Sequence, residues 1–186
     1  MQIFSYMNRF IVSFSFIFIS FSLIAEPTLE EVVVSARKVD ESVQDVPIAM
    51  SVFTASDIND AGIERPEDFI ALTPNVVMAN TVNVGDTLVT IRGLTSTRDA
   101  ESNFAFVVDG VLQTNPNAFN RELLDIAQIE VLKGPQGALY GRNATSGAIL
   151  ITTKAPSDEP ESSAVVGMGI NNSSKLQYVN SSKMGD

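Results

Sequence analysis

The stretch that decides the fold is Gly147-Ala148-Ile149-Leu150-Ile151-Thr152-Thr153-Lys154. Side chains alternate between the two faces of an extended chain, so Ile149 and Ile151 lie on one face and Leu150 lies on the other. Both faces are therefore apolar. A strand of this kind is buried on each side, inside a domain. We predict that Ala148–Thr153 is an interior strand of a sheet.

Upstream of this strand, short apolar runs alternate with turn residues, which is typical of a compact α+β domain. The further strands that this pattern predicts are Ile48–Phe53, Val76–Met78, Thr87–Arg92, Ala105–Asp109 and Gln128–Leu132. The predicted fold class is an α+β domain over residues 47–155, with a small mixed β-sheet and short helices.

Three segments carry helix signals. Ser56-Asp57 offers an N-cap for a first short helix, and Gly62 offers its C-terminal stop. Pro66-Glu67-Asp68 opens a second helix with acidic side chains at its positive end, and Thr73-Pro74 closes it. Asn120–Leu124 fits a single helical turn.

The segments on either side of this domain differ from it in their pattern of apolar and polar residues. Residues 26–46 predict a flexible N-terminal segment with one strand-prone patch, Val32-Val33-Val34. Residues 156–186 predict a linker followed by two strands, Ser163–Ile170 and Leu176–Asn180, joined by a hairpin. An isolated two-stranded hairpin is marginal in water, so these strands require further partners.

The first 25 residues have the composition of an export signal. Met1–Arg9 carries one positive charge, Phe10–Ile24 is almost wholly apolar, and Ala25 offers a small residue at the cut. This apolar run is shorter than the ~20 residues that a membrane-spanning helix needs. A short N-terminal anchor is the alternative.

Composition excludes several classes of function. The residues after Ala25 include 22 acidic and 12 − 1 = 11 basic side chains, a net charge of −11. We expect no nucleic-acid binding, because phosphate contacts need clustered Lys and Arg. The chain has no Cys and no His, which excludes disulfides, sites with thiolate or imidazole ligands, and Ser–His or Cys–His catalysis. A hydrolase with paired carboxylates is an alternative, but no pair of acids stands out. We expect no enzyme activity, metal site or cofactor.

Six motifs, in this order along the chain, resemble the plug region of TonB-dependent outer-membrane receptors. They are Glu30-Glu31-Val32-Val33-Val34-Ser35-Ala36, Ile91-Arg92-Gly93, Val108-Asp109-Gly110-Val111, Ile129-Glu130-Val131-Leu132-Lys133-Gly134-Pro135, Leu139-Tyr140-Gly141-Arg142-Asn143-Ala144 and Gly147–Lys154. Each motif alone is weakly specific, whereas six in series behind an export signal are strongly so. The resemblance covers residues 30–154, and the segment to about residue 181 resembles the first two strands of a transmembrane β-barrel.

The resemblance implies that the first motif is an energy-coupling box, which binds the periplasmic protein TonB. Its residues are Glu30, Glu31, Val32, Val33, Val34, Ser35 and Ala36. This box segment has no proline or glycine and has a β-branched centre, which suits addition of a strand to the sheet edge of another protein. Without the resemblance, the same residues also fit an ordinary first strand of the domain.

Three basic residues lie near predicted strand ends or turns: Arg92, Lys133 and Arg142. Basic residues in such places are commonly surface charges. The resemblance implies instead that they meet acidic residues on the inner wall of the barrel. Lys133 stands where arginine is more usual, and lysine cannot hold a carboxylate as a two-pronged fork.

Counting strands places two loops at one end of the domain. If sequential strands run up and down, the loops Ala79–Asp86 and Gln113–Asn120 share the outer end. The resemblance also implies that outward plug loops bind cargo. The candidate ligand-facing residues are Asn80, Thr81, Asn83, Asp86, Gln113, Asn115, Asn117, Phe119 and Asn120. Asparagine-rich loops also favour turns for purely local reasons.

These observations predict the plug and energy-coupling portion of an outer-membrane receptor for active uptake of a scarce nutrient, such as a ferric siderophore or another metal chelate. The expected partners are TonB, the receptor's own barrel, the cargo and the outer membrane. A barrel needs several hundred residues beyond this chain, so we expect that the chain alone does not transport. The alternative is a free periplasmic α+β ligand-binding module.

Overall fold

The computed structural model describes residues 31–35, 38–81, 87–97, 101–156, 159–169 and 174–182. The expected export signal lies outside the described residues, as do Glu30, Ala36, Asn83 and Asp86.

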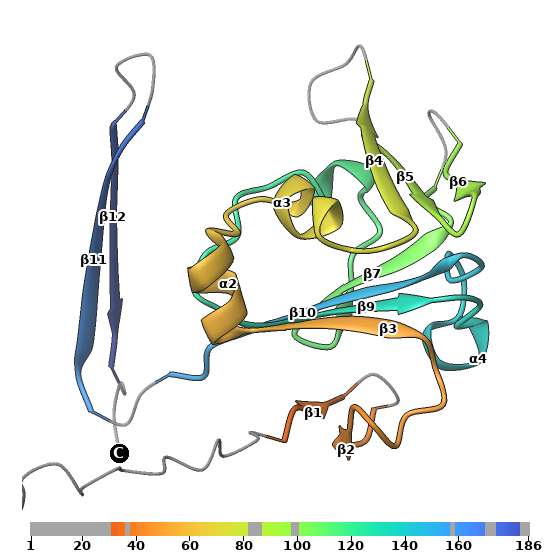
Figure 1. Cartoon of the computed structure of the whole chain (residues 1–186), viewed down its shortest axis with the longest axis horizontal. Coiled ribbons are helices and arrows are strands. Elements are labelled where there is room, and N and C mark those ends of the chain that lie inside the picture. The colour runs from red at the N-terminus through yellow and green to blue at the C-terminus, as the bar shows by residue number, and fades with distance from the viewer. Residues whose placement is uncertain are drawn as a thin grey trace, which may run out of the picture. The chain divides into compact units, whose positions relative to one another are not determined.

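A five-stranded mixed sheet forms the centre of the domain (Figure 1). Its middle strand, β10 (Gly147–Thr153), runs antiparallel to β9 (Ile126–Lys133) and parallel to β7 (Phe104–Val108). β3 (Met50–Thr54) pairs with β9 at one edge, and β8 (Val111–Leu112) pairs with β7 at the other. The predicted interior strand is confirmed, because β10 is buried on both faces over most of its length.

A second, three-stranded sheet is formed by β4 (Val76–Asn80), β5 (Thr87–Ile91) and β6 (Leu94–Thr95). Both of its pairings are antiparallel. Arg92 and Gly93, which connect β5 to β6, have positive φ angles of 50° and 82°. This backbone conformation matches the twist of a tight two-residue hairpin.

Two short helices, α2 (Ala55–Ala61) and α3 (Pro66–Ala71), begin and end at recognisable signals. Gly62 ends α2 in the left-handed conformation, and Pro66 begins α3, both as predicted. The N-cap of α2 is Thr54, two residues earlier than predicted. Thr54 and Asp57 form a reciprocal capping box, and the hydrogen bonds from Thr54 lower the pKa of the Asp57 carboxyl.

The helical turn predicted at Asn120–Leu124 is wrong. A single 3₁₀ turn, η1 (Pro116–Ala118), lies four residues earlier. Asn115 caps it, because its side-chain oxygen accepts a hydrogen bond of 3.0 Å from the Asn117 amide. A short α-helix, α4 (Gly137–Tyr140), follows β9.

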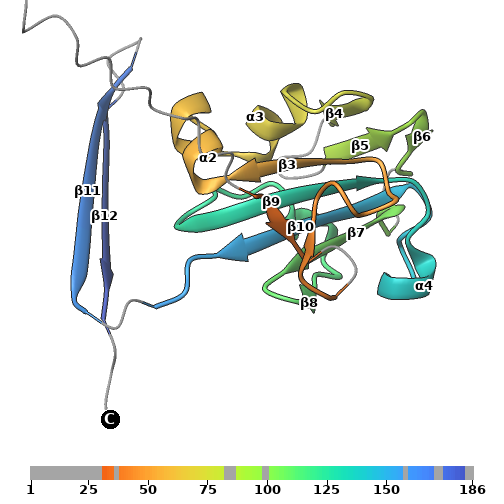
Figure 2. The same ribbon diagram turned by 60° about the horizontal axis from the view of Figure 1, so that its bottom comes forward.

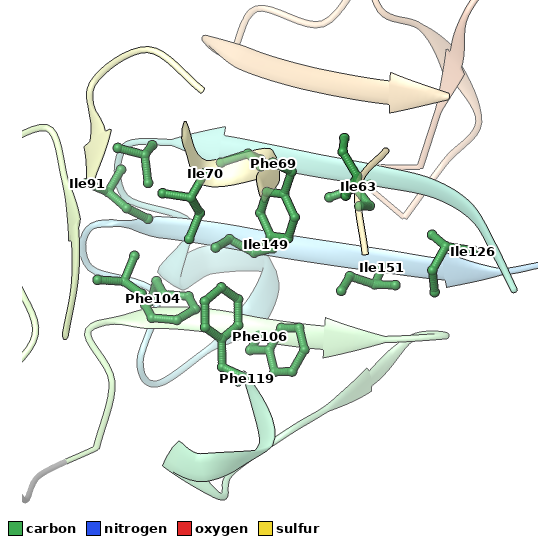
Figure 3. Close-up of a cluster of buried hydrophobic side chains, with 14 of the residues drawn as sticks. Ile63, Phe69, Ile70, Ile91, Phe104, Phe106, Phe119, Ile126, Ile149 and Ile151 are labelled. Atoms are coloured by element: carbon green, nitrogen blue, oxygen red, sulfur yellow. The ribbon is translucent and has the colours of Figure 1, made fainter. Parts of the chain in front are cut away.

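The larger hydrophobic core lies between the five-stranded sheet, the two helices and the three-stranded sheet (Figure 3). Phe119 is at its centre, with ring centroids 5.1 Å from Phe106, 5.2 Å from Phe104 and 6.3 Å from Phe69. A smaller apolar cluster, which includes Leu132 and Leu150, lies on the opposite face of the sheet. The two clusters explain why β10 is apolar on both sides.

The predicted C-terminal hairpin is confirmed as an antiparallel pair, β11 (Glu161–Met168) and β12 (Ser174–Ser181). Its register pairs Val166 with Leu176 and Ala164 with Tyr178 on one face. Lys175 and Gln177 fall on the other face. The hairpin therefore has one apolar and one mixed face, and the apolar face is exposed.

The N-terminal segment differs from its prediction as a flexible stretch. β1 (Val33–Val34) and β2 (Glu41–Ser42) form an antiparallel pair. Val34 and Val46 are buried, so this segment gains apolar contacts that its short length did not suggest. Among the described residues, no helix is long and apolar enough to cross a membrane.

Candidate functional site

The described residues of the box segment, 31–35, lie on the face of the five-stranded sheet opposite α2 and α3 (Figure 2). Its strand β1 pairs with β2, and the carbonyl of Val32 accepts a hydrogen bond of 3.0 Å from the amide of Val43. Residues 32 and 34 therefore direct their backbone groups toward β2. The alternate residues, 33 and 35, direct theirs to the opposite edge of the strand.

Two side chains of β9 occupy this opposite edge. The side-chain amide of Gln128 donates a hydrogen bond of 3.0 Å to the carbonyl of Val33. The backbone amide of Ser35 donates a hydrogen bond of 3.1 Å to Oε1 of Glu130. Gln128 and Glu130 are two residues apart on one strand and therefore point to the same face. Together they present one donor and one acceptor at the spacing of a strand edge.

Glu130 is a buried carboxylate on a central strand of the sheet, only 2% exposed. Burial of a carboxylate is costly unless it is hydrogen-bonded. Ser35 supplies two contacts to its Oε1, through the amide and, at 3.4 Å, the hydroxyl. Burial, and then the Glu130 charge, raise the pKa of the nearby Tyr140 phenol to about 12. The ammonium group of Lys38, just after the box segment, lies 5.7 Å from the centre of the Tyr140 ring.

Sequence reasoning missed Gln128, Glu130, Lys38 and Tyr140 as functional candidates. Glu130 and Tyr140 belong to motifs that carry the resemblance, but there they served only to identify the family. A signal was present: Glu130 is a charged residue between the apolar Ile129 and Val131 of a predicted interior strand. A charge in that position indicates a specific partner.

Arg92 and Lys133 lie close together at another end of the sheet. A Cβ atom on Gly134 would be 3.1 Å from Nη1 of Arg92, so this glycine makes room for the guanidinium group. Burial, and then the charge of Arg92, lower the pKa of Lys133. Lys133 donates a hydrogen bond of 3.0 Å to the hydroxyl of Ser51. Within the described residues neither cation forms an ion pair.

Arg142, the third basic candidate, is placed differently. Its guanidinium group pairs with Glu101 at 3.2 Å, and both side chains are more than half exposed. Its charge therefore has a partner within the domain itself. The prediction that it contacts a barrel wall stays a prediction and gains no support from this geometry.

The strand count that placed two loops at one end is wrong for Gln113–Asn120. Asp109 and Gly110 have positive φ angles and form a tight turn into β8, which the count left out. The chain therefore turns back, and the Gln113 amide donates a hydrogen bond to the carbonyl of Phe106. The loop returns along β7, whereas Asn80 and Thr81 follow β4 in the other sheet.

Phe119 is also wrong as a ligand-facing residue, because it is only 3% exposed and lies at the centre of the core. Asn115 caps η1, which is the local role of a turn asparagine. Asn80 and Asn117 are exposed, and Thr81, Gln113 and Asn120 are partly so. Contact of these residues with cargo stays a prediction.

Among the described residues, no group of acidic side chains is arranged to hold a metal ion. A hollow of about 270 Å³ beside Phe119 is lined mainly by apolar side chains, including Phe106, Ile126 and Ile151. Of its polar lining residues, Gln113 and Thr153 bond to Val111 and Asp109 within the fold, and Arg121 and Glu122 are exposed. The features with specific polar geometry are therefore the docked box segment and the Arg92–Lys133 cation pair.

Comparison with known proteins agrees with this fold. Residues 42–148 match the model of the TonB-dependent Receptor Plug Domain family, and the chain belongs to this family. It is 31% identical to the pesticin receptor of Yersinia enterocolitica over 136 residues, which cover 73% of this chain and 20% of that receptor. It is 27% identical to the ferrichrome outer membrane transporter/phage receptor of Escherichia coli, over 68% of this chain and 17% of that protein.

Among solved structures, the ferric yersiniabactin uptake receptor of Yersinia pestis superposes with a TM-score of 0.68 at 28% identity. The match covers 75% of this chain and 22% of that receptor. The chain thus spans about a fifth of the length of these relatives. Family membership confirms the predicted plug fold and places the chain in the bacterial outer membrane.

Proposed function

We propose that the chain is the plug and energy-coupling portion of a receptor that takes up a scarce nutrient, such as a ferric siderophore, across the outer membrane. Its role is to bind and gate, not to catalyse a covalent reaction. Its relatives include receptors named for pesticin, ferrichrome and ferric yersiniabactin. The observation that carries the proposal is a strand-forming box segment immediately before a plug domain.

The Arg92–Lys133 pair supports a surrounding wall with acidic side chains. Two cations held close together repel one another, and partial burial adds to the cost of the charge on Lys133. Within the described residues neither has an acidic partner. Carboxylates facing this end of the sheet would remove that cost, and the receptor's own barrel is the partner that would supply them.

The exposed apolar face of β11 and β12 supports a role for this hairpin at the start of the barrel. Membrane-spanning strands alternate between lipid-facing apolar residues and polar residues that face the lumen. Met168, Leu176 and Tyr178 lie on one face and are 91%, 78% and 65% exposed. In water this surface would be unfavourable, whereas contact with lipid would stabilise it.

The coupling role is tested by binding of the periplasmic domain of TonB to variants of the box segment. Val33→Pro removes a backbone amide that an added strand would use, so we expect at least a tenfold loss of affinity. Val33→Ala keeps that amide and is the matched control. Equal binding by the parent and by Val33→Pro would reject the assignment of residues 30–36 as the coupling box.

A further inference from the structure

The box segment is held on both edges of its strand. β2 occupies the edge formed by residues 32 and 34, while Gln128 and Glu130 occupy the edge formed by residues 33 and 35. A strand from another protein needs one free edge, with amides and carbonyls available for a ladder. In this structure β2 pairs with the first edge, and the carbonyl of Val33 and the amide of Ser35 on the second edge are already hydrogen-bonded.

We propose that Gln128 and Glu130 are positioning residues that hold the box strand on the plug and cover the edge onto which TonB adds its strand. The proposal rests on the coupling role proposed above and deepens it. Release of this edge breaks the bond from Gln128 to Val33 and the contacts of Ser35 with Glu130, and it uncovers the side chain of Val34. The edge covered by β2 can then remain paired.

The chemistry of the two residues suits a reversible hold. Glu130 projects from the same face of β9 as Leu132. An apolar side chain at this position would pack against the smaller apolar cluster. A carboxylate there is stabilised by the amide and hydroxyl of Ser35 while the box segment is docked. After release, water can replace those donors, because the departing segment uncovers the group. An apolar residue in its place would instead resist uncovering.

A thiol-labelling experiment tests the hold directly. The chain has no cysteine, so Val34→Cys introduces a single thiol, and its labelling rate reports exposure of the box strand. Val34 is 1% exposed and Val33 is 48% exposed. In the parent background, we expect a maleimide to react at least tenfold more slowly with Val34→Cys than with Val33→Cys. Val89→Cys, in the core strand β5 and 0% exposed, reports general unfolding.

Glu130→Ala should raise the labelling rate of Val34→Cys at least about tenfold, because it removes a hydrogen bond to a charged group. The rates of Val33→Cys and Val89→Cys should not change. Gln128→Leu should have a smaller effect, since its bond is between neutral groups. Glu130→Gln, which keeps an oxygen acceptor of the same shape, should lie between Glu130→Ala and the parent.

A second route avoids the core, in case Glu130→Ala does not fold. Ser35→Pro removes the donor amide from the box side and should accelerate labelling of Val34→Cys to a similar extent. Ser35→Ala keeps the amide and is the control. The proposal is overturned if Val34→Cys stays as slow in Glu130→Ala and Ser35→Pro as in the parent, or if Val89→Cys accelerates equally.

Binding of the TonB periplasmic domain separates this proposal from the coupling role. Docking of the box strand on the plug lowers the fraction of molecules in which TonB can reach the strand edge. Because Glu130→Ala should raise that fraction about tenfold, it should bind TonB about tenfold more tightly. Faster labelling of Val34→Cys in Glu130→Ala, with no binding of TonB by the parent or the variant, would support docking of the strand by Glu130 and reject the coupling role. Loss of binding in Val33→Pro, with no effect of Glu130→Ala on labelling or affinity, would keep the coupling role and reject the hold.

Discussion

The carboxylate of Asp109 accepts two hydrogen bonds from Thr153, one of 2.8 Å from its amide and one of 3.0 Å from its hydroxyl. Asp109 begins the tight turn between β7 and β8, and Thr153 ends β10. The bonds thus tie the turn to the last residue of the central strand. In the proposed receptor, the chain leaves the plug for the barrel just beyond this point.

Asp109→Ala should lower the free energy of unfolding by about 1–3 kcal/mol, because two hydrogen bonds to a charged group are lost. Asp109→Asn should lose less, since asparagine tolerates the positive φ of 47° and keeps one acceptor. Urea unfolding of the three proteins measures this order. Equal stability of Asp109→Ala and the parent would show that the tie contributes nothing.

Gly147→Ala should be strongly destabilising. A Cβ atom at this position would overlap the carbonyl oxygen of Leu132 and lie 3.2 Å from Cδ1 of Ile91. The backbone of two paired strands would have to separate, so we expect a loss of about 2 kcal/mol or more.

Gly137→Ala is the matched control, because a Cβ atom there meets nothing within 4 Å. Its free energy of unfolding should stay within about 0.5 kcal/mol of the parent. A similar loss in both variants would contradict the close approach at Gly147.

The two tyrosines after the export signal should titrate separately. Burial and the Glu130 charge raise the pKa of Tyr140 to about 12, whereas hydrogen bonds with Ser162 and Asn180 lower the pKa of Tyr178. Tyrosinate absorbance should therefore rise in two steps. Tyr178→Phe should remove the lower step and Tyr140→Phe the upper one.

The sign of the Tyr140 effect on stability follows from its raised pKa. Folding favours the neutral phenol of Tyr140, so its contribution to the free energy of unfolding is fully present below the pKa of the unfolded state, about 10. It is lost as the pH rises toward 12. Glu130→Gln should move the upper step downward, and an unchanged upper step would show that Glu130 carries no charge beside Tyr140.

Lys133→Met should not lower the stability of this chain. The substitution removes a partly buried cation that Arg92 repels, which offsets the lost hydrogen bond to Ser51. We expect the free energy of unfolding to stay within about 0.5 kcal/mol of the parent or to rise. Thermal unfolding measures it, with Arg142→Ala as the control for an exposed ion pair. A loss above about 1 kcal/mol would reveal an acidic partner within the chain.

The central strand and the fold class could be predicted, because Ile149, Leu150 and Ile151 place apolar groups on both faces, which is typical of a strand buried on both sides. The β7–β8 hairpin could also be predicted, since Asp109-Gly110 is a strong hairpin signal. Without that turn, the strand count put Gln113–Asn120 at the wrong end. It also offered Phe119 as a ligand contact, although an aromatic residue beside a core strand is more readily buried.

The docking of the box segment could not be predicted. Ser35 and Glu130 are 95 residues apart, and no local pattern relates one to the other. Sequence indicates that residues 32–34 form a strand, but the edge that the strand uses depends on the tertiary arrangement of β9 and β2. The same holds for Arg92 and Lys133, whose closeness arises from two different sheets.

Amide hydrogen exchange at Ser35, with and without the periplasmic domain of TonB, tests the central claim most directly. We predict that this amide is protected in the parent, loses protection in Glu130→Ala, and regains it in Glu130→Ala when TonB is added, because the TonB strand then takes the place of Glu130. An amide that stays unprotected in that complex, or is already unprotected in the parent, would contradict the account.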